Sequence, residues 1–381
     1  MALRILVLDT YYPAFLAEHY GGRPEIALRG YEEQLSALMD RCFGTSDAYS
    51  RHLRELGHDV IDVVANCEPL QLRWAREQGN TNRALHRLGA ILPGRAGSIA
   101  ARAFLRRIAL AQIETFDPDV VYLQDLWFLA TSDLDALKRA GRFVAGQIAS
   151  GLPPEPIVRR FDLLLTSFPH FVQRFREQGL DSEYLKIAFD DKVLERLREL
   201  GIEADPAAPR EHAVAFVGGL DPRVHGTGTR MLERVADEVE LEIWGYGASA
   251  LPETSPILSR YRGEAWGLAM YEVLARSRVA LNRHIDVAEG YANNMRLYEA
   301  TGVGALLVTE ASSNLAELFE PEREVVVYEG EDDLVEQLRH YAAHDDERRR
   351  IAAAGQARTL REHTYAQRIA ELATMLEARV G

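Results

Sequence analysis

The residues best suited to chemistry lie in the stretch 289–310, which reads as a loop, a short helix, a glycine turn and a buried strand. Asn293 and Asn294 are N-cap candidates for the helix MRLYEA. This layout directs free backbone N–H groups and a positive helix end toward the loop, which suits an anion. Arg296 and Glu299 lie three residues apart, near one helix face. A cation for phosphate and a carboxylate for sugar hydroxyls would suit a nucleotide sugar, although a surface Arg–Glu pair is an equal alternative.

A second group of candidates lies between a predicted strand and a predicted helix, in the loop GGLDPRVHGTGT. Glycines in such a loop let the backbone approach a phosphate and place it at the helix N-terminus. The candidates are Gly218, Gly219, Arg223 and His225, with Arg230 as a further cation. The loop lacks both the G-x-G-x-x-G pattern and the Gly-Lys-Ser/Thr ending of a P-loop, so a plain flexible loop is an alternative. Two candidate phosphate-binding sites on one domain favour a nucleotide ligand.

Polar residues also follow the predicted strands of the first half of the chain. Asp9, Asp125 and His170 come at or near the ends of the apolar runs RILVL, VVYL and LLLT. In open α/β sheets, ligands gather beyond the carboxyl ends of the strands. Each residue can act as a general base or hold substrate hydroxyls, and the alternative for each is an N-cap or a loop hydrogen bond. Asp125 is the first choice, since a partly desolvated carboxylate can take a hydroxyl proton.

The order of the predicted elements tells how these residues are positioned. Residues 1–190 alternate strands and helices, which predicts a parallel sheet with helices on both faces. Residues 191–211 combine a charged helix with a Pro/Ala-rich piece and are the best interdomain linker. A second alternating unit covers 212–355, and the helix 356–381 is expected to pack back across both domains. The predicted fold class is α/β, with two Rossmann-like domains facing across a cleft.

Composition excludes several classes of protein. A chain of 381 residues, 47% of them hydrophobic, is long enough for two domains. The net charge of −14 argues against a nucleic-acid partner. Two cysteines, Cys42 and Cys67, suggest neither a disulfide framework nor a metal site, and they favour a cytoplasmic protein. The N-terminus reads as a first strand and not as a signal peptide, and no apolar run approaches about 18 residues, so no transmembrane segment is expected.

The second half resembles group 1 glycosyltransferases of GT-B architecture, especially the CgeB-like (spore-maturation-protein-like) branch. The resemblance lies in FVGG, in LEIWGYG, in MYEVLARSRVALNRH and in the run from Asn294 to Thr309. The segment AGQARTLREHTYAQR is similar to the C-terminal tail of that family. The match covers about residues 212–370, whereas the first half is similar to an acceptor domain only in plan.

The resemblance implies transfer of a sugar from a nucleotide donor to an acceptor hydroxyl, without a bound metal or cofactor. Glu299 would take the ribose hydroxyls, and Gly218-Gly219 would face the diphosphate. Two departures are that Glu289 precedes Glu299 by ten residues, where many relatives have Glu-x7-Glu, and that the second domain has no lysine. Arg223, His225 or Arg296 would then serve the diphosphate.

The expected partners are the nucleotide sugar and a glycan, a lipid-linked glycan or a protein as acceptor, in surface polysaccharide or glycoconjugate synthesis. Peripheral membrane contact and oligomeric state stay open. Two other functions stay open as well: a nucleotide-sugar epimerase of GT-B type, and a catalytically silent sugar-nucleotide-binding protein. A pyridoxal-phosphate phosphorylase is excluded because the second domain contains no lysine for the Schiff base.

Overall fold

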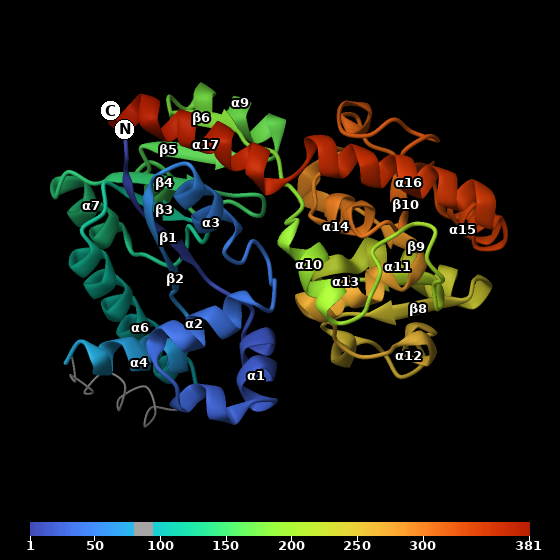
Figure 1. The fold of residues 1–381 in the computed structure, drawn as a ribbon, viewed down its shortest axis with the longest axis horizontal. Helices are drawn as coiled ribbons and strands as arrows, with labels where there is room; N and C mark the ends of the chain where they lie inside the picture. Colours follow the sequence, from blue (N-terminus) through green and yellow to red (C-terminus); the bar gives the residue numbers. More distant parts are fainter. Residues whose placement is uncertain (80–93) are drawn as a thin grey trace. The chain divides into compact units, whose positions relative to one another are not determined.

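The computed structural model describes residues 1–79 and 94–381. The chain divides into two compact units, one made of Met1–Lys186 with Ile369–Gly381 and the other of Ile187–Arg368, called here the first and second unit. Each unit is built on one parallel β-sheet covered by helices (Figure 1). The predicted α/β class with two parallel sheets is confirmed. Within the predicted first domain, residues 80–93 lie outside the described part of the chain.

The sheet of the first unit has six parallel strands in the order β2-β1-β3-β4-β5-β6. Its four inner strands are short and mainly apolar, as a sheet covered on both faces requires, whereas the two edge strands carry acidic residues. They are β1 Arg4–Asp9, β2 Asp59–Val64, β3 Val120–Leu123, β4 Phe143–Gln147, β5 Leu163–Thr166 and β6 Ser182–Tyr184. The helices are α1 Pro13–Gly21, α2 Tyr31–Met39, α3 Ala48–Glu55, α4 Glu68–Glu77, α6 Gly94–Phe116, α7 Thr131–Arg139, α8 Glu155–Val158 and α9 Pro169–Glu177, with a 3-10 turn at Pro24–Leu28.

The sheet of the second unit has five parallel strands in the order β11-β10-β9-β7-β8. These are β7 His212–Val217, β8 Leu241–Trp244, β9 Ser277–Asn282, β10 Leu306–Glu310 and β11 Val326–Tyr328. The helices are α10 Lys192–Glu199, α11 Pro222–Glu238, α12 Ile257–Arg260, α13 Leu268–Ala275, α14 Arg296–Gly302, α15 Glu331–Ala343 and α16 Asp345–Glu362, and α17 Tyr365–Val380 leads back into the first unit. Short 3-10 turns lie at Ala248–Ala250, Asp286–Ala288 and Leu315–Glu317.

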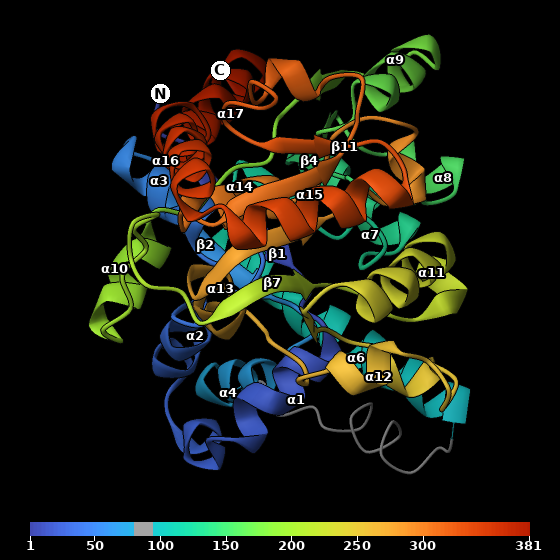
Figure 2. The same ribbon diagram turned by 90° about the vertical axis from the view of Figure 1, so that its right-hand side faces the viewer.

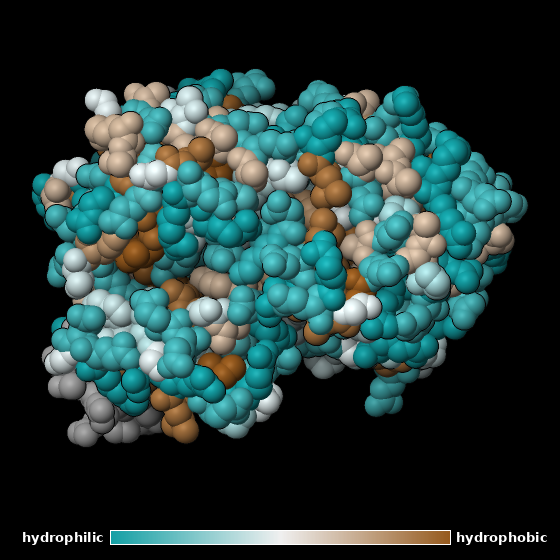
Figure 3. Space-filling model, in the orientation of Figure 1, coloured by the Kyte–Doolittle hydropathy of each residue, from teal (hydrophilic) through white to brown (hydrophobic). Residues whose placement is uncertain are grey.

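Two helix layers enclose the second sheet. Helices α11 and α15 pack together on one face, where their apolar sides bury Leu232, Val235, Leu334 and Leu338 (Figure 2). Helices α13, α14 and α16 cover the other face. On the face of the molecule seen in Figure 3, hydrophobic residues appear in small groups among hydrophilic ones. Both faces of the sheet are therefore covered, and the predicted donor residues lie at the carboxyl ends of its strands.

The segment 191–211, predicted as a linker, lies within the second unit. It ends in Arg210, whose side chain is buried. The guanidinium donates hydrogen bonds to the carbonyls of Leu274, Ala275, Ser277, Asp205, Val303 and Gly304. Burial lowers the pKa of Arg210 to about 10, so it is charged at neutral pH and can hold the ends of α13 and α14 together. A Pro/Ala-rich composition does not reveal such contacts, because the carbonyls lie far along the chain.

Arg379, in the last turn of α17, fastens this helix to the first unit. Its Nε and Nη2 reach the two carboxylate oxygens of Asp181 at 2.6 and 3.0 Å, and Nη2 lies 2.8 Å from an oxygen of Glu183. Replacing Arg379 by methionine is expected to lower the free energy of unfolding by about 1 kcal/mol, the upper end for an exposed ion pair.

The effect should depend on pH. The hydrogen bond from Arg379 lowers the pKa of Asp181 below its ordinary value. The stabilisation is therefore present above the unfolded pKa of about 4 and is lost as pH falls through the folded pKa. Urea unfolding of parent and variant between pH 7 and pH 3 measures this difference. A difference that stays constant over that range would contradict the assignment.

Candidate functional site

The glycine loop after β7 is a place of close backbone approach. A Cβ on Gly245, which follows β8 with φ +156°, would lie 1.7 Å from the carbonyl oxygen of Gly218. A Cβ on Gly219 would lie 2.2 Å from Nε2 of His225. The backbone contact therefore requires glycine at Gly245, whereas the side chains of Phe216 and His225 lie against Gly218 and Gly219. Gly245 was not among the residues predicted from the sequence.

The glycine loop is shorter than predicted, because α11 begins at Pro222. Proline suits the first helical position, and the Asp221 carboxylate caps the helix by accepting the N–H of Arg223 at 2.9 Å. The Arg223 side chain is 80% exposed and also binds Asp221, at 2.6 Å, so it turns back onto the cap. His225 interrupts the helix with φ −122° and ψ 32°, and its ring lies over Gly219. Of the three cations predicted in this loop, His225 lies against Gly219, and Nη1 of Arg230 would lie 3.8 Å from a Cβ on Gly226, whereas Arg223 is turned toward Asp221.

Arg296 joins the two predicted halves of the site. Its Nη2 donates to the carbonyl of Val217, the last residue of β7, at 3.1 Å. Its Nη1 lies 2.8 Å from a carboxylate oxygen of Glu299. Glu299 is only 6% exposed, and burial raises its pKa, opposed by the charge of Arg296 and a hydrogen bond from Tyr271. The helix α14 is thereby fixed beside the glycine loop, with a buried carboxylate and a guanidinium at the strand end.

Asn294 fixes the start of α14, whereas Asn293 does not. The Oδ1 of Asn294 accepts the N–H of Leu297 at 3.3 Å and so binds the first turn of a helix that begins at Arg296, one residue later than predicted. Its Nδ2 donates to Oδ1 of Asn282 at 2.7 Å and to the carbonyl of Arg283 at 2.8 Å. The side-chain nitrogen of Asn293 is buried and finds no hydrogen-bond acceptor among the described residues.

The structure adds a group of residues that the sequence analysis missed, at the ends of β9, β10 and β11. Asn282 donates to Oγ1 of Thr309 at 2.9 Å, and Tyr328 donates to the Asn282 carbonyl at 3.2 Å. Next to them lies a pocket of about 300 Å³, whose lining includes Arg283 and Glu310. The signal was available, because polar residues follow the buried strand VALNRH as they follow the strands of the first half.

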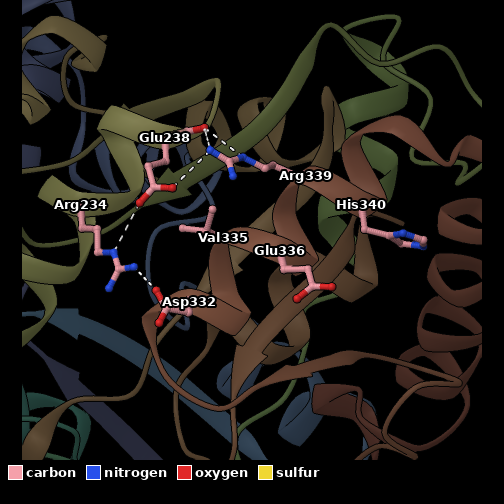
Figure 4. A pocket seen from close by; sticks show the side chains of 7 residues that line it. All are labelled: Arg234, Glu238, Asp332, Val335, Glu336, Arg339 and His340. Carbon is pink, nitrogen blue, oxygen red and sulfur yellow. Dashed lines mark hydrogen bonds and ion pairs between the residues drawn. The ribbon is translucent and has the colours of Figure 1, made fainter.

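A second pocket of the same unit has a structural explanation. It has a volume of about 590 Å³ and lies between α11 and α15 (Figure 4). Four of the charged side chains that line it are paired with one another: Arg234 binds Glu238 and Asp332, and Arg339 lies 3.2 Å from Glu238. These ion pairs link the two helices, and the pocket contains none of the predicted residues.

In the first unit the structure brings Asp9 and Asp125 together. Asp9 is the last residue of β1, and Asp125 lies two residues beyond the end of the neighbouring strand β3. Thr10 links them: its N–H donates to Asp9 Oδ1 at 2.7 Å and its hydroxyl to Asp125 Oδ2 at 2.8 Å. The other oxygen of Asp125 accepts the N–H of Trp127 at 2.8 Å. Asp125, the first choice from sequence, therefore has both oxygens engaged in shaping its loop.

His170 lies apart from this pair. It stands in the first turn of α9, after β5, and β4 separates β5 from β3. Two strand spacings amount to about 10 Å. Its ring packs against Phe168 and Phe171, with centroids 5.1 and 4.8 Å away. The residues predicted for acceptor chemistry thus divide into one pair of carboxylates and one separate histidine.

Comparisons with known proteins agree with the fold. Residues 223–374 match the protein family described as glycosyl transferase-like. No curated protein matches the chain. Among solved structures, HepE from Anabaena in complex with UDP-glucose has 14% identity and a TM-score of 0.58, with 99% of this chain and 100% of that one covered. Sucrose-phosphate synthase from Thermosynechococcus elongatus has 11% identity and a TM-score of 0.57, with 99% and 98% covered.

Trehalose 6-phosphate synthase from Burkholderia multivorans is similar too, with 11% identity, a TM-score of 0.57 and both chains covered completely. Among the described residues, the structure contains no helix with the length and apolar character needed to span a bilayer. The two parallel sheets and these likenesses establish a GT-B fold with a glycosyltransferase-like domain in its second half.

Proposed function

We propose that the protein is a metal-independent glycosyltransferase that moves a sugar from a nucleotide diphosphate sugar to an acceptor hydroxyl. The observation that carries the proposal is the bond from Arg296 to the Val217 carbonyl, which sets Glu299 beside the glycine loop. A carboxylate for ribose hydroxyls and backbone N–H groups for phosphate then lie at one end of one sheet.

Each residue has a role in this proposal. Glu299 binds the ribose, and Gly218-Gly219 and Arg296 face the diphosphate, assisted by His225. Arg223 can assist only after it leaves Asp221, and Asn294 holds the start of α14. Charge builds up on the leaving diphosphate as the glycosidic bond breaks, so fixed N–H dipoles and a guanidinium stabilise the transition state most. In the first unit, Asp9 acts on the acceptor.

The finer assignments belong to the same proposal. The chain is a CgeB-like enzyme of the cytoplasm that glycosylates a glycan, a lipid-linked glycan or a protein in surface polysaccharide or glycoconjugate synthesis. UDP is the first nucleotide to test, because one protein of similar fold is complexed with UDP-glucose.

Ligand binding tests the proposal directly. A ligand that binds only the folded state raises its stability, so a matching nucleoside diphosphate at 100 times its Kd should add about 2.7 kcal/mol to the free energy of unfolding. The nucleoside without phosphate should bind more weakly, because charge-assisted contacts are lost. Melting curves with UDP, GDP, ADP and dTDP, followed by calorimetry against the nucleoside, measure this.

Turnover then separates the enzyme classes. Release of nucleoside diphosphate from a donor sugar supports a transferase, and isolation of an altered free sugar or sugar nucleotide would favour the epimerase. Nucleotide binding without any turnover would favour a binding protein. Absence of stabilisation by all four diphosphates would refute the proposal.

A further inference from the structure

The pocket at the ends of β9, β10 and β11 has no role in the proposed nucleotide contacts. Its volume of about 300 Å³ is at the small end for ligand sites. A space of that size holds roughly ten water molecules, close to the dozen non-hydrogen atoms of one hexose. Its lining includes Thr227, Arg283, Gly290, Glu310, Ser312 and Tyr328. It is therefore large enough for one sugar ring and too small for a whole nucleotide sugar.

The charges of the lining argue against a phosphate. The carboxylate of Glu310 accepts the backbone N–H of His284 at 3.3 Å, which holds it at the rim of the pocket. Glu331 also lines the pocket and pairs with Arg234 at 3.2 Å. Burial, reinforced by the charge of Arg283, lowers the pKa of His284 to about 4, so this ring is neutral at neutral pH. The lining thus carries no excess of positive charge, which is unfavourable for an anion.

The position of Arg283 is set by Gly228. A Cβ on Gly228 would lie 2.1 Å from Nη1 of Arg283 and 2.4 Å from its Cζ, so the guanidinium occupies the space beside α11 that a side chain at residue 228 would fill. The pocket then offers a donor, Arg283, and an acceptor, Glu310. Sugar hydroxyls both donate and accept hydrogen bonds, and a guanidinium with a carboxylate serves them in both directions.

We propose that this pocket binds the transferred sugar, and that the sugar is a neutral hexose and not a uronic acid. Glu310 accepts hydrogen bonds from its hydroxyls, Arg283 donates to them, and the acidic lining disfavours a carboxylate on the ring. This inference rests on the proposed function. It adds the class of sugar and two binding residues to it.

The test compares ligands that share the nucleotide. Calorimetry with UDP, UDP-glucose and UDP-glucuronate is run on the parent and on Glu310→Gln, Gly228→Ala and the control Glu253→Gln, a change in an exposed turn. We expect the parent to bind UDP-glucose about tenfold more tightly than UDP, the value of one good hydrogen bond. It should bind UDP-glucuronate more weakly than UDP-glucose. If GDP is the preferred diphosphate, GDP and GDP-mannose replace the first two ligands.

In Glu310→Gln, the affinity for UDP-glucose should exceed the affinity for UDP by much less than in the parent. The difference in affinity between UDP-glucose and UDP-glucuronate should become smaller, and the Kd for UDP should stay unchanged. Gly228→Ala should weaken the sugar contribution by displacing Arg283, and Glu253→Gln should behave like the parent. Melting temperatures show that each variant is folded. A parent that binds UDP but gains nothing from the glucose, or a Glu310→Gln variant that keeps the gain, overturns the inference alone. A folded parent that binds no nucleoside diphosphate overturns the proposed function as well.

Discussion

Replacing Asp9 by asparagine is expected to lower turnover by about 10²–10⁴-fold, the usual contribution of a general base. The carboxylate ends β1 at the edge of the sheet where ligands gather. Its Oδ1 accepts the Thr10 N–H, and no described residue donates to Oδ2. Asp125 lacks such an oxygen, because Trp127 and Thr10 donate to both of its own. Asp9 is thus better placed than Asp125 to take an acceptor proton.

The protonation of Asp9 sets the expected pH dependence. Burial raises its pKa to about 7, the charges of Asp125 and Asp62 add to this, and the Thr10 N–H opposes it. A base must be ionised to act, so kcat/KM of the parent should rise with pH up to about 7 and level above it. The rise should be absent from the residual activity of Asp9→Asn.

As pH rises, the stability of the parent should fall, whereas its activity should rise. Because the folded pKa lies above the unfolded one, the folded state binds more protons, and stability is lost as pH rises from about 4 to about 7. Asp9→Asn has no carboxylate to ionise, so it should melt at a higher temperature than the parent at pH 8, and this gain should shrink as pH falls and vanish below about pH 4.

Asp59→Asn is the matched control. This exposed aspartate begins the neighbouring parallel strand β2, so it lies at the amino ends of the strands, away from the carboxyl ends where Asp9 lies. It should keep its turnover. Asp125→Asn should mainly lose stability, by about 1 kcal/mol for a lost loop hydrogen bond. A fully active Asp9→Asn variant that binds donor would place the acceptor chemistry elsewhere, with His170→Asn as the next variant to measure.

Features of the fold that depend on neighbouring residues could be predicted from the sequence. Alternating apolar runs and helices predicted both parallel sheets, and the rule on strand ends led to Asp9, Asp125 and Gly218. Asn294 was predicted as a cap because asparagine before a helix binds a backbone N–H, and its bond to Leu297 agrees. The start of α11 was predicted too late, although Asp221-Pro222 is itself a helix start signal.

Contacts between distant segments could not be predicted in the same way. That Gly228 makes room for Arg283, and that Gly245 touches Gly218, depends on how strands pack side by side. The partners of Arg210 are backbone carbonyls. Every residue has a carbonyl, so residue types do not indicate which carbonyls will accept these hydrogen bonds. The sequence likewise does not show whether a candidate cation forms an ion pair within the protein, as Arg223 does with Asp221.

Replacing Glu299 by alanine is expected to weaken donor binding by about 1.5–3 kcal/mol, the value of a hydrogen bond to a charged group. The carboxylate is buried beside Arg296, which ties α14 to the end of β7. Glu299→Gln keeps the shape and one acceptor but loses the charge, so it should fall between parent and alanine. Glu317→Ala, on an exposed 3-10 turn, is the control and should bind as the parent does.

A nucleotide that lacks one ribose hydroxyl shows whether Glu299 contacts the ribose. It distinguishes the loss of that contact from a general disruption of the site by the substitution. We expect the parent to prefer UDP over 2′-deoxy-UDP, or over the 3′-deoxy compound, because the deoxy ligand lacks the hydroxyl that donates a hydrogen bond to the Glu299 carboxylate. In Glu299→Ala the preference should disappear, since the group that distinguishes the ligands is gone, and the double-mutant cycle gives the coupling energy. Loss of Glu299 also removes the ion-pair partner of Arg296, so melting temperatures must accompany the calorimetry. If Glu299→Ala remains folded and still discriminates the deoxy ligand as the parent does, another residue binds the ribose.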